Sequence, residues 1–452
     1  MKSHPTSWAS TTIREVLLPS AAGKLIVQGW SPQCHRTPAA DSESWGVLKT
    51  TAIQTDGFLP EENKSLPDHL EPRPELEVQQ GDLLITCAGP RSRCGVACLV
   101  RTTRPRLMIS GKMYRLRANE SVIDPRCAAY YLQSPGAQRA IDAVKTGISD
   151  SGLNLTHERF LSLPLPLPPL PEQRRIVEAI EAAFSKLDAG VAYLEAARKR
   201  TSRLTMALLH KEIDQQAAAP LTIAELAVLV TDGDHRPPPR VADGIPHLSS
   251  KHIRDGALIL HDCSYLSDAG FEQTRARYEP MAGDVIVTCV GSIGRTAVVP
   301  AGLVFSADRN LAGIRPRPAV DSRYLSLALS APNAQRQMLS ASGATAQPHI
   351  YLRDLRRVEV PLPGLDEQRA IAQRLDMTHE HLARLTRDLQ REQTRSDGLR
   401  RAVLAAAFSG RLVSQNAADE PGEVLLARAQ RESDGTTPRA GQRRARTRGA
   451  VS

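Results

Sequence analysis

The sequence predicts an α+β protein in which one unit of about 200 residues occurs twice. Three observations predict this fold class: motifs that recur in the same order, a front part with mixed short strands and helices in each copy, and a long helix behind each front part. The chain has 452 residues, of which 41% are hydrophobic, so it can form two or three domains that each bury a core.

Three motifs carry the repeat. They pair as Gly81–Cys87 with Gly283–Cys289, Ser134–Arg139 with Ala331–Arg336, and Pro166–Arg174 with Pro361–Arg369. The offset falls only from 202 to 195 residues along the chain. Because the order is kept and the offset changes little, the sequence predicts an internal pseudo-two-fold repeat.

The front part of each copy combines turn signals with short apolar runs such as Leu83–Thr86 and Val285–Thr288, which favours short strands mixed with helices. A proline-rich segment leads into the back part. There Glu172 in the first copy and Asp366 and Glu367 in the second lie at the positive end of a starting helix.

Each back part carries a heptad stripe. In the second copy, one series is Leu375, Leu382, Leu389, Ser396 and Val403, and its companion series is Ile371, Thr378, Leu385, Glu392 and Leu399. The first copy repeats this register 195 residues earlier. A helix with one apolar stripe is not stable alone, so each helix is the expected partner of the other. The stripe favours a rigid spacer, and a docking face for another protein is the alternative.

The predicted division of the chain follows from these features. The segments are a first domain (1–165), a first spacer helix (166–215), a second domain (216–360), a second spacer helix (361–413), and a short helix with a disordered basic tail (414–452). Within the last segment the helix is expected over Glu423–Arg431 and the disorder over Ser433–Ser452. Its arginines are expected to be solvated, with DNA phosphates as the alternative ligand.

Charge and composition limit the function. The 58 Lys and Arg against 49 Asp and Glu give a net charge of +9, which favours nucleic acid as a partner, whereas 4% aromatic residues argue against a base-stacking surface for single strands. The first residues lack an apolar signal region, and no stretch approaches a membrane span of about 18 apolar residues, so we expect a cytoplasmic protein without membrane contact. The seven cysteines are scattered and predict reduced thiols; Cys94 and Cys98 leave structural zinc as the alternative.

Motifs of catalysis are missing from the sequence. It has no phosphate-binding loop, no dinucleotide fingerprint, no zinc-protease motif and no nucleophile elbow, and the carboxylates of Asp68, Glu75 and Glu77 lack the lysine of a nuclease set. The chain is therefore interpreted as a recognition or assembly module. Two other hypotheses are a compact nuclease or methyltransferase with unrecognised motifs, and a coiled-coil scaffold or adaptor without sequence-specific DNA binding.

Several motifs together resemble one known family. They are Glu172–Arg174 and Glu367–Arg369 at the helix starts, Gly283–Thr288 with Gly291–Gly294, Thr231–His235 with Gly244–Pro246, and the ending Ala407–Val413. In this order, over residues 8 to about 432, the chain resembles the DNA-specificity subunit of type I restriction-modification systems. The first domain departs from the second, because Gly89–Gly95 replaces the shorter turn Gly291–Gly294.

The resemblance implies two target-recognition domains held apart by two antiparallel coiled-coil-like spacer helices. It implies a non-catalytic chain without a metal or cofactor of its own, which reads a bipartite asymmetric sequence in double-stranded DNA. The implied partners are two methyltransferase subunits and the restriction and translocase subunits. S-adenosylmethionine, ATP and Mg²⁺ are then expected in those partner subunits.

Residues that donate to base edges or phosphates are the candidates for DNA binding. In the first domain they are Arg91, Arg93, Arg101, Arg104 and Lys112, and in the second they are His235, Arg236, Lys251, Arg254, Arg295, Arg309 and Asn310. Each of them alone is expected to contact a phosphate or solvent rather than a base. Candidates for partner binding are Glu172, Gln173, Arg174, Glu367, Gln368 and Arg369, for which helix capping is the simpler alternative.

Overall fold

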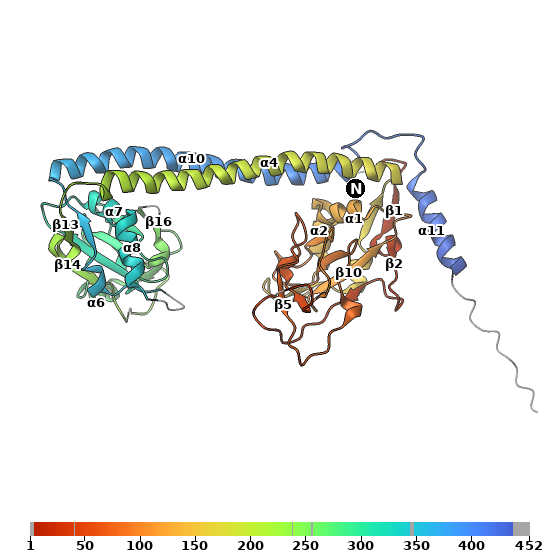
Figure 1. Ribbon diagram of the computed structural model, residues 1–452, viewed down its shortest axis with the longest axis horizontal. Helices are drawn as coiled ribbons and strands as arrows, with labels where there is room; N and C mark the ends of the chain where they lie inside the picture. The colour runs from red at the N-terminus through yellow and green to blue at the C-terminus, as the bar shows by residue number, and fades with distance from the viewer. Residues whose placement is uncertain (1–3, 40, 237, 255, 344–347, 437–452) are drawn as a thin grey trace, which may run out of the picture. The chain divides into compact units, whose positions relative to one another are not determined.

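A computed structural model describes residues 4–39, 41–236, 238–254, 256–343 and 348–436. The chain divides into two compact units. Unit 1 contains the residues up to Val191 and those from Thr394 onwards, and unit 2 contains Ala192–Gln393. Each unit therefore combines one front domain with parts of both long helices (Figure 1).

The strands of unit 1 are short. They are β1 (Ala9–Thr12), β2 (Leu17–Leu18), β3 (Val27–Gln28), β4 (Gly46–Leu48), β5 (Asn63–Ser65), β6 (Leu83–Thr86), β7 (Ala88–Gly89), β8 (Ala97–Leu99), β9 (Leu107–Met108), β10 (Met113–Ala118), β11 (Leu153–Asn154) and β12 (Pro164–Leu167). The central sheet has the order β2-β10-β6-β8, with β3 also paired to β10. A second sheet has β4 between β5, which is antiparallel to it, and β9, which is parallel. The pairs β1 with β12 and β7 with β11 complete the strand pairing described in this unit.

Helices cover the sheet of unit 1 on the side of the long helices. They are α1 (Pro125–Gln133), α2 (Pro135–Val144) and α3 (His157–Leu161). Asp124 caps α1 by accepting a hydrogen bond from the Arg126 amide at 2.8 Å, and Ser134 caps α2 through the Ala137 amide at 3.2 Å. Figure 1 shows α1 between the sheet of β10 and the long helix α4 (Leu170–Leu209).

Unit 2 repeats this arrangement. Its strands are β13 (Pro220–Thr222), β14 (Ala227–Asp232), β15 (Ile245–Leu248), β16 (Ile253–Arg254), β17 (Ala257–Leu258), β18 (Ser264–Leu266), β19 (Val285–Thr288), β20 (Thr296–Val298), β21 (Ser306–Ala307), β22 (Leu311–Pro316) and β23 (Glu359–Pro361). Its short helices are α5 (Ile223–Leu226), α6 (Asp268–Arg275), α7 (Ser322–Ser330), α8 (Pro332–Ala341) and α9 (Leu352–Leu355). The order β22-β19-β20 matches β10-β6-β8, and β15 between β18 and β21 matches β4 between β5 and β9. The predicted internal repeat and the α+β class are confirmed.

The recurring Gly-Asp pair has a structural cause. Gly81 and Gly283 both have φ near +90°, the left-handed region that favours glycine. The aspartate that follows is buried in both units and accepts a hydrogen bond from an arginine on the neighbouring strand, Arg117 to Asp82 at 3.1 Å and Arg315 to Asp284 at 2.9 Å. The motif therefore recurs because a buried carboxylate needs a positive partner.

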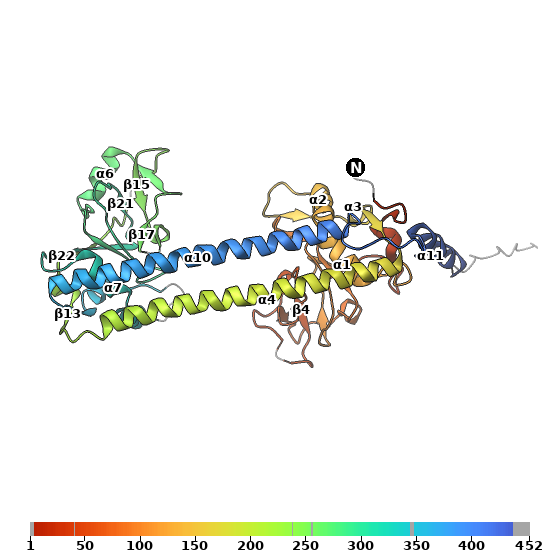
Figure 2. The ribbon, with the colours of Figure 1, turned by 90° about the horizontal axis from the view of Figure 1, so that it is seen from above.

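The two long helices, α4 and α10 (Leu365–Ala407), lie side by side within each unit in both views (Figures 1 and 2). In unit 1, Arg400 forms an ion pair with Asp188 and its guanidinium lies 4.9 Å from the centre of the Phe184 ring. In unit 2, Arg374 pairs with Glu212 at 3.0 Å, just beyond the end of α4. Late residues of α4 thus meet early residues of α10 and the reverse, so the helices are antiparallel, as expected.

The contact between the helices is narrower than the heptad pattern predicts. In α10 the series that contains Leu382 and Leu389 is buried. In the companion series, Leu385 is 41% exposed and Leu399 is 46% exposed. The two helices pack together as predicted, but in α10 the companion series is only partly covered at Leu385 and Leu399.

The C-terminal helix α11 (Gly422–Thr436) belongs to unit 1 and packs against β1. It continues past Arg431, so the predicted disorder from Ser433 was wrong up to Thr436. The rest of that predicted tail, residues 437–452, lies outside the described residues. Within the described part of the chain, none of the helices is both long and apolar enough to cross a bilayer.

Candidate nucleic-acid interface

In unit 2, the polar candidates gather around the turn between β21 and β22, residues 307–310. The Asp234 amide donates to the Ala307 carbonyl at 3.0 Å, which brings the segment with His235 and Arg236 to this turn. The Asp308 amide donates to the Leu248 carbonyl at 2.9 Å and so brings the neighbouring residues of β15 there.

Two further candidates follow from contacts of Asn310. Its carbonyl accepts a hydrogen bond from the Ser250 hydroxyl at 3.4 Å, next to Lys251, and one from the Cys289 amide at 2.8 Å. Cys289 directly follows β19, whose last residue Thr288 donates from its amide to the Arg295 carbonyl at 2.9 Å. Segments that are distant in the sequence thus present their cations and one amide on a single loop surface.

An aspartate fixes one edge of this surface. Asp232 accepts hydrogen bonds from Arg277 Nε at 3.0 Å and from His235 Nε2 at 2.8 Å. Burial opposes its ionisation, but these donors outweigh that effect and lower the pKa of Asp232. The carboxylate therefore stays charged and holds His235 in place.

Other cations on this surface are unengaged. The side chains of Arg236, Arg295 and Arg309 are exposed and make no hydrogen bond or ion pair with any described residue. Lys251 donates to the Asp262 carbonyl at 3.0 Å, and Arg254 donates to the Lys251 carbonyl at 3.1 Å. The surface can therefore accept an anion mainly through three free guanidinium groups.

In unit 1 the candidates do not gather in this way. Arg91 pairs with Asp150 at 3.0 Å, and Arg101 pairs with Glu181 of α4 at 2.5 Å. The hydrogen bond to Glu181 raises the pKa of Arg101. Arg104, whose pKa burial lowers, donates to the Ser44 carbonyl at 3.2 Å. Only Lys112 of this group is exposed without a partner among the described residues.

Arg93 is engaged inside the unit. It is half-buried and donates to the carbonyls of Thr50 and Ile53, the latter at 2.6 Å, and to Gln54 Oε1 at 3.3 Å. An arginine that binds backbone carbonyls holds a loop together. The structure thus gives Arg93 a stabilising contact where the sequence suggested a free cation.

Sequence reasoning missed Gln28 and Ser31, which contact Gly111, the residue before Lys112. The Gln28 side-chain amide donates to the Gly111 carbonyl at 2.8 Å, and the Gly111 amide donates to the Ser31 hydroxyl at 3.0 Å. A signal existed in the sequence, because Gly29 in unit 1 corresponds to Gly233 of the Thr231–His235 motif in unit 2. The residues around Gly29 differ too much from that motif for the match to be seen.

The partner-binding candidates at the start of α4 include two buried side chains. Gln173 donates from Nε2 to the carbonyls of Val122 and Pro168 at 3.0 and 2.9 Å, and its Oε1 accepts from the Asp124 amide at 2.8 Å. This glutamine therefore joins the N-cap of α1 to the start of α4. The neighbouring Arg174 is exposed.

Gln368 makes the equivalent contacts at the start of α10. Its Nε2 donates to the carbonyls of Ala319 and Pro363 at 3.1 and 2.8 Å, and its Oε1 accepts from the Asp321 amide at 2.8 Å. Both glutamines are thus fully used within the chain. Arg369 is 62% exposed at its side chain and lies 3.9 Å from Asp366.

Glu172 and Glu367 occupy equivalent positions but different surroundings. Glu172 is buried and accepts from Trp8 Nε1 at 3.0 Å and from Gln415 Nε2 at 2.7 Å. Burial raises the pKa of Glu172, and these donors only partly offset it. Glu367 is exposed and accepts from Arg374 at 3.2 Å. Docking of a partner through either residue stays a prediction.

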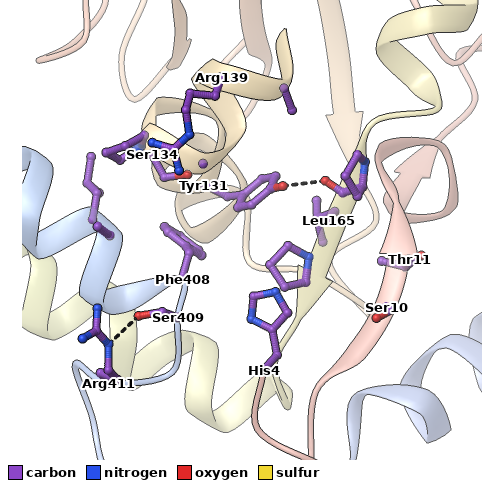
Figure 3. A pocket seen from close by; sticks show the side chains of 17 residues that line it. His4, Ser10, Thr11, Tyr131, Ser134, Arg139, Leu165, Phe408, Ser409 and Arg411 are labelled. Atoms are coloured by element: carbon purple, nitrogen blue, oxygen red, sulfur yellow. Dashed lines mark hydrogen bonds between the residues drawn. The ribbon is translucent and has the colours of Figure 1, made fainter. Parts of the chain in front are cut away.

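A hollow of about 570 Å³ lies in unit 1 near the N-terminal segment (Figure 3). Two of its serine hydroxyls are engaged: Ser134 caps α2, and Ser409 donates to the Ala406 carbonyl at 3.1 Å. Tyr131 donates to the Pro164 carbonyl at 2.5 Å, as Figure 3 shows. His4 stacks on Trp8. None of these four contacts pairs a hydroxyl with a histidine.

Metal-ligating side chains are not clustered in the described part of the chain: no group of three or more His, Cys, Asp or Glu that could hold an ion is found there. All seven cysteines are free. Cys94 and Cys98 are both buried, and burial raises the pKa of each thiol, for Cys98 to about 12.

Comparisons with known proteins agree with this geometry. The Escherichia coli type I restriction enzyme EcoEI specificity subunit is 36% identical over 204 residues, which cover 45% of this chain and 33% of that protein. The EcoBI specificity subunit of the same organism is 25% identical over 323 residues, 65% of this chain and 67% of that protein. The chain therefore matches about a third of the length of the first relative and two thirds of the second.

A solved chain described in a study of assembly and conformational transition of the type I restriction-modification system has the same fold. The TM-score is 0.66 at 22% identity, and the match covers 90% of this chain and 99% of that one. The family model for the type I restriction modification DNA specificity domain matches residues 37–191 and 258–392. These two regions cover most of each front domain and together exceed half of the sequence, so the chain belongs to the family of type I restriction-modification DNA specificity subunits.

Proposed function

We propose that this chain selects the DNA sequence for a type I restriction-modification complex. Each front domain reads one half of a bipartite asymmetric site, and the helices α4 and α10 act as the spacer. The observation that carries the proposal is the repeat itself. One frame occurs twice, and the side chains at equivalent surface positions differ, with Lys112 in unit 1 where unit 2 has Asn310.

DNA contact is proposed first for the free cations. In unit 2 these are Arg236, Arg295 and Arg309, beside His235, Lys251, Arg254 and Asn310. In unit 1 the free cation among the described candidates is Lys112, whereas Arg91 is exposed but paired with Asp150. For Arg93, Arg101 and Arg104 the proposal requires that each side chain release its present partner in the chain. We therefore rank these three below the others as DNA contacts.

Assembly is proposed with two methyltransferase subunits and with restriction and translocase subunits. Exposed apolar side chains on the long helices, among them Leu204, Leu385 and Leu399, support a partner that packs along the spacer. At the helix starts, Arg174, Glu367 and Arg369 are accessible, whereas Glu172, Gln173 and Gln368 are buried. Docking at the starts would therefore use the three accessible residues.

The chemistry belongs to the partners in this proposal. S-adenosylmethionine, ATP and Mg²⁺ bind in the partner subunits, and this chain supplies recognition and assembly. The complex then works in the cytoplasm, where its DNA substrate is. The proposed domain boundaries remain 1–165 and 216–360 for the two recognition domains, 166–215 and 361–413 for the spacers, and 414–452 for the end.

The test combines the purified chain with its methyltransferase subunits, S-adenosylmethionine and duplex DNA, and maps the modified bases by sequencing. We expect modification at one bipartite sequence with the full set and none with the chain alone. Methylation or cleavage by the chain alone would support the enzyme hypothesis instead. If the complex shows no salt-sensitive duplex binding, the scaffold hypothesis stands.

A further inference from the structure

The two units share a pair of turns that the sequence repeat did not reveal. In unit 1, the Gly29 amide donates to the Met113 carbonyl at 3.3 Å, and the Trp30 amide donates to the Ile109 carbonyl at 3.1 Å. We call residues 27–31 together with 109–113 the first turn pair. It joins the end of β3 to the loop between β9 and β10.

The same two hydrogen bonds occur in unit 2. The Gly233 amide donates to the Leu311 carbonyl at 3.1 Å, and the Asp234 amide donates to the Ala307 carbonyl at 3.0 Å. Residues 231–235 together with 307–311 are the second turn pair. It joins the end of β14 to the loop between β21 and β22, so the backbone frame is the same in both units.

Glycine is required at the crossing point of each pair. A Cβ atom on Gly29 would overlap the Ile109 carbonyl, and one on Gly233 would overlap the Ala307 carbonyl. The two backbone segments of each pair therefore lie too close together for any side chain at the glycine. This close contact fixes the backbone positions of the neighbouring residues. The side chains at those positions can still differ between the two units.

The first turn pair presents polar side chains around Gly111. Gln28 is exposed and spends one N–H on the Gly111 carbonyl, which leaves its side-chain oxygen free to accept. Ser31 accepts from the Gly111 amide and keeps its own hydroxyl proton. Lys112 beside them is exposed and unpaired within the described residues.

The second turn pair presents different groups at the same places. His235 takes the place of Ser31 and is held by Asp232 at 2.8 Å. Arg309 is exposed, and the side-chain amide of Asn310 makes no hydrogen bond with a described residue. The Asn310 side-chain oxygen can thus accept a hydrogen bond, and Arg309 and the Asn310 side-chain nitrogen can donate, all from a fixed backbone.

We propose that these two turn pairs are the base-reading elements of the chain, Gln28, Ser31 and Lys112 for one half-site and His235, Arg309 and Asn310 for the other. The proposal rests on the proposed function and names the residues that give it sequence specificity. Phosphate binding needs only charge, whereas base edges are told apart by placed donors and acceptors such as Gln, Asn, Arg and Lys. An asymmetric site requires two readers with one frame and different side chains.

Neutral amide variants test the proposal without changing the charge. Gln28→Ala and Asn310→Ala are made in the full chain, and each is assembled with its methyltransferase partners. Selection from random duplexes and modified-base sequencing then give the preference for each half-site. We expect Gln28→Ala to lower discrimination about 10- to 100-fold at one or more positions of one half-site only, and Asn310→Ala to do so in the other. The slope of binding against salt concentration stays the same.

Matched controls are Gln80→Ala in unit 1 and Gln273→Ala in unit 2, which remove exposed amides outside the turn pairs. Unchanged preferences in both Gln28→Ala and Asn310→Ala, or the same loss in the controls, overturn the proposal. If the unaltered complex selects no sequence at all, the proposed function fails and not merely this assignment. All four positions are at the surface or half-buried, and thermal unfolding confirms that each variant is folded.

Discussion

Gln173 and Gln368 make the same three hydrogen bonds in the two halves of the chain. Each binds the backbone amide of a capping aspartate, Asp124 or Asp321, and two backbone carbonyls. The recurring Glu-Gln-Arg motif is therefore in part a structural joint. It fastens the N-terminus of α1 in unit 1, or of α7 in unit 2, to the start of the spacer helix that follows.

The first prediction concerns this joint. Gln173→Leu leaves one buried amide and two carbonyls without partners, and each orphaned group costs about 1–3 kcal/mol. We expect the free energy of unfolding of unit 1 to fall by about 3 kcal/mol in urea or thermal unfolding. Arg174→Ala, on the exposed next residue, is the control and should change stability by no more than about 0.5 kcal/mol. Equal effects of the two changes would contradict the joint.

The second prediction separates the two heptad series of α10. Leu389 is buried and Leu385 is 41% exposed, although both fit the heptad pattern. Leu389→Asp places a charge in the contact between the helices and should cost about 3 kcal/mol or more. Leu385→Asp on the same helix should cost less than about 1 kcal/mol. Thermal unfolding of both variants checks this, and similar losses would mean that the seam includes the companion series.

The third prediction uses the buried Glu172. Because burial raises its pKa, the folded chain holds this proton more tightly than the unfolded chain does. Its contribution to stability is therefore fully present below about pH 4.3, the usual pKa of a glutamate, and is lost as the pH rises through the folded pKa. Glu172→Gln keeps an acceptor for Trp8 and Gln415 and removes the titration.

We expect the melting temperature of Glu172→Gln, relative to the unaltered chain, to rise as the pH increases above about 4.3, and to level off once Glu172 is ionised in the folded chain. The measurement is thermal unfolding at several pH values from about 4.3 upwards. Glu367→Gln is the matched control, since its carboxylate occupies the same position in the repeat but is exposed. A pH-independent difference for Glu172→Gln would falsify the account of the buried carboxylate.

The repeat made much of the fold predictable from the sequence. Gly81–Asp82 and Gly283–Asp284 recur because each needs the same left-handed turn and the same buried ion pair, so the letters themselves are constrained. The long helices were predictable from their heptads. The exposure of Leu385 was not, because periodicity shows which residues share a face but not what covers that face.

The candidate interface was less predictable. His235, Arg295 and Arg309 come together only through the pairing of β14, β19 and β22, which no local signal specifies. Arg93 shows the opposite case. Its position in a glycine-rich segment suggested a free cation that could bind an anion, but its guanidinium donates to backbone carbonyls of its own domain. Charge in a sequence identifies candidates, and only the partners in the fold decide which are free.

The last prediction distinguishes those two arginines by their salt dependence. Each phosphate contact that is lost lowers the slope of log binding constant against log salt concentration by about 0.9. Arg295 is exposed and unengaged in the described part of unit 2, so Arg295→Ala should lower the slope by about that amount and leave the melting temperature unchanged. Arg93→Ala should do the reverse: its donors to Thr50 and Ile53 are lost, unit 1 becomes less stable, and the slope is kept. Titration of duplex DNA at several salt concentrations, with thermal unfolding of both variants, gives the two readouts.

Arg275→Ala, which removes an exposed cation already paired with Glu272, controls for a general change of charge. A lowered slope with unchanged stability for Arg93→Ala would return that residue to the DNA interface, because its contacts with the carbonyls would then contribute little to folding and its charge would contribute to binding.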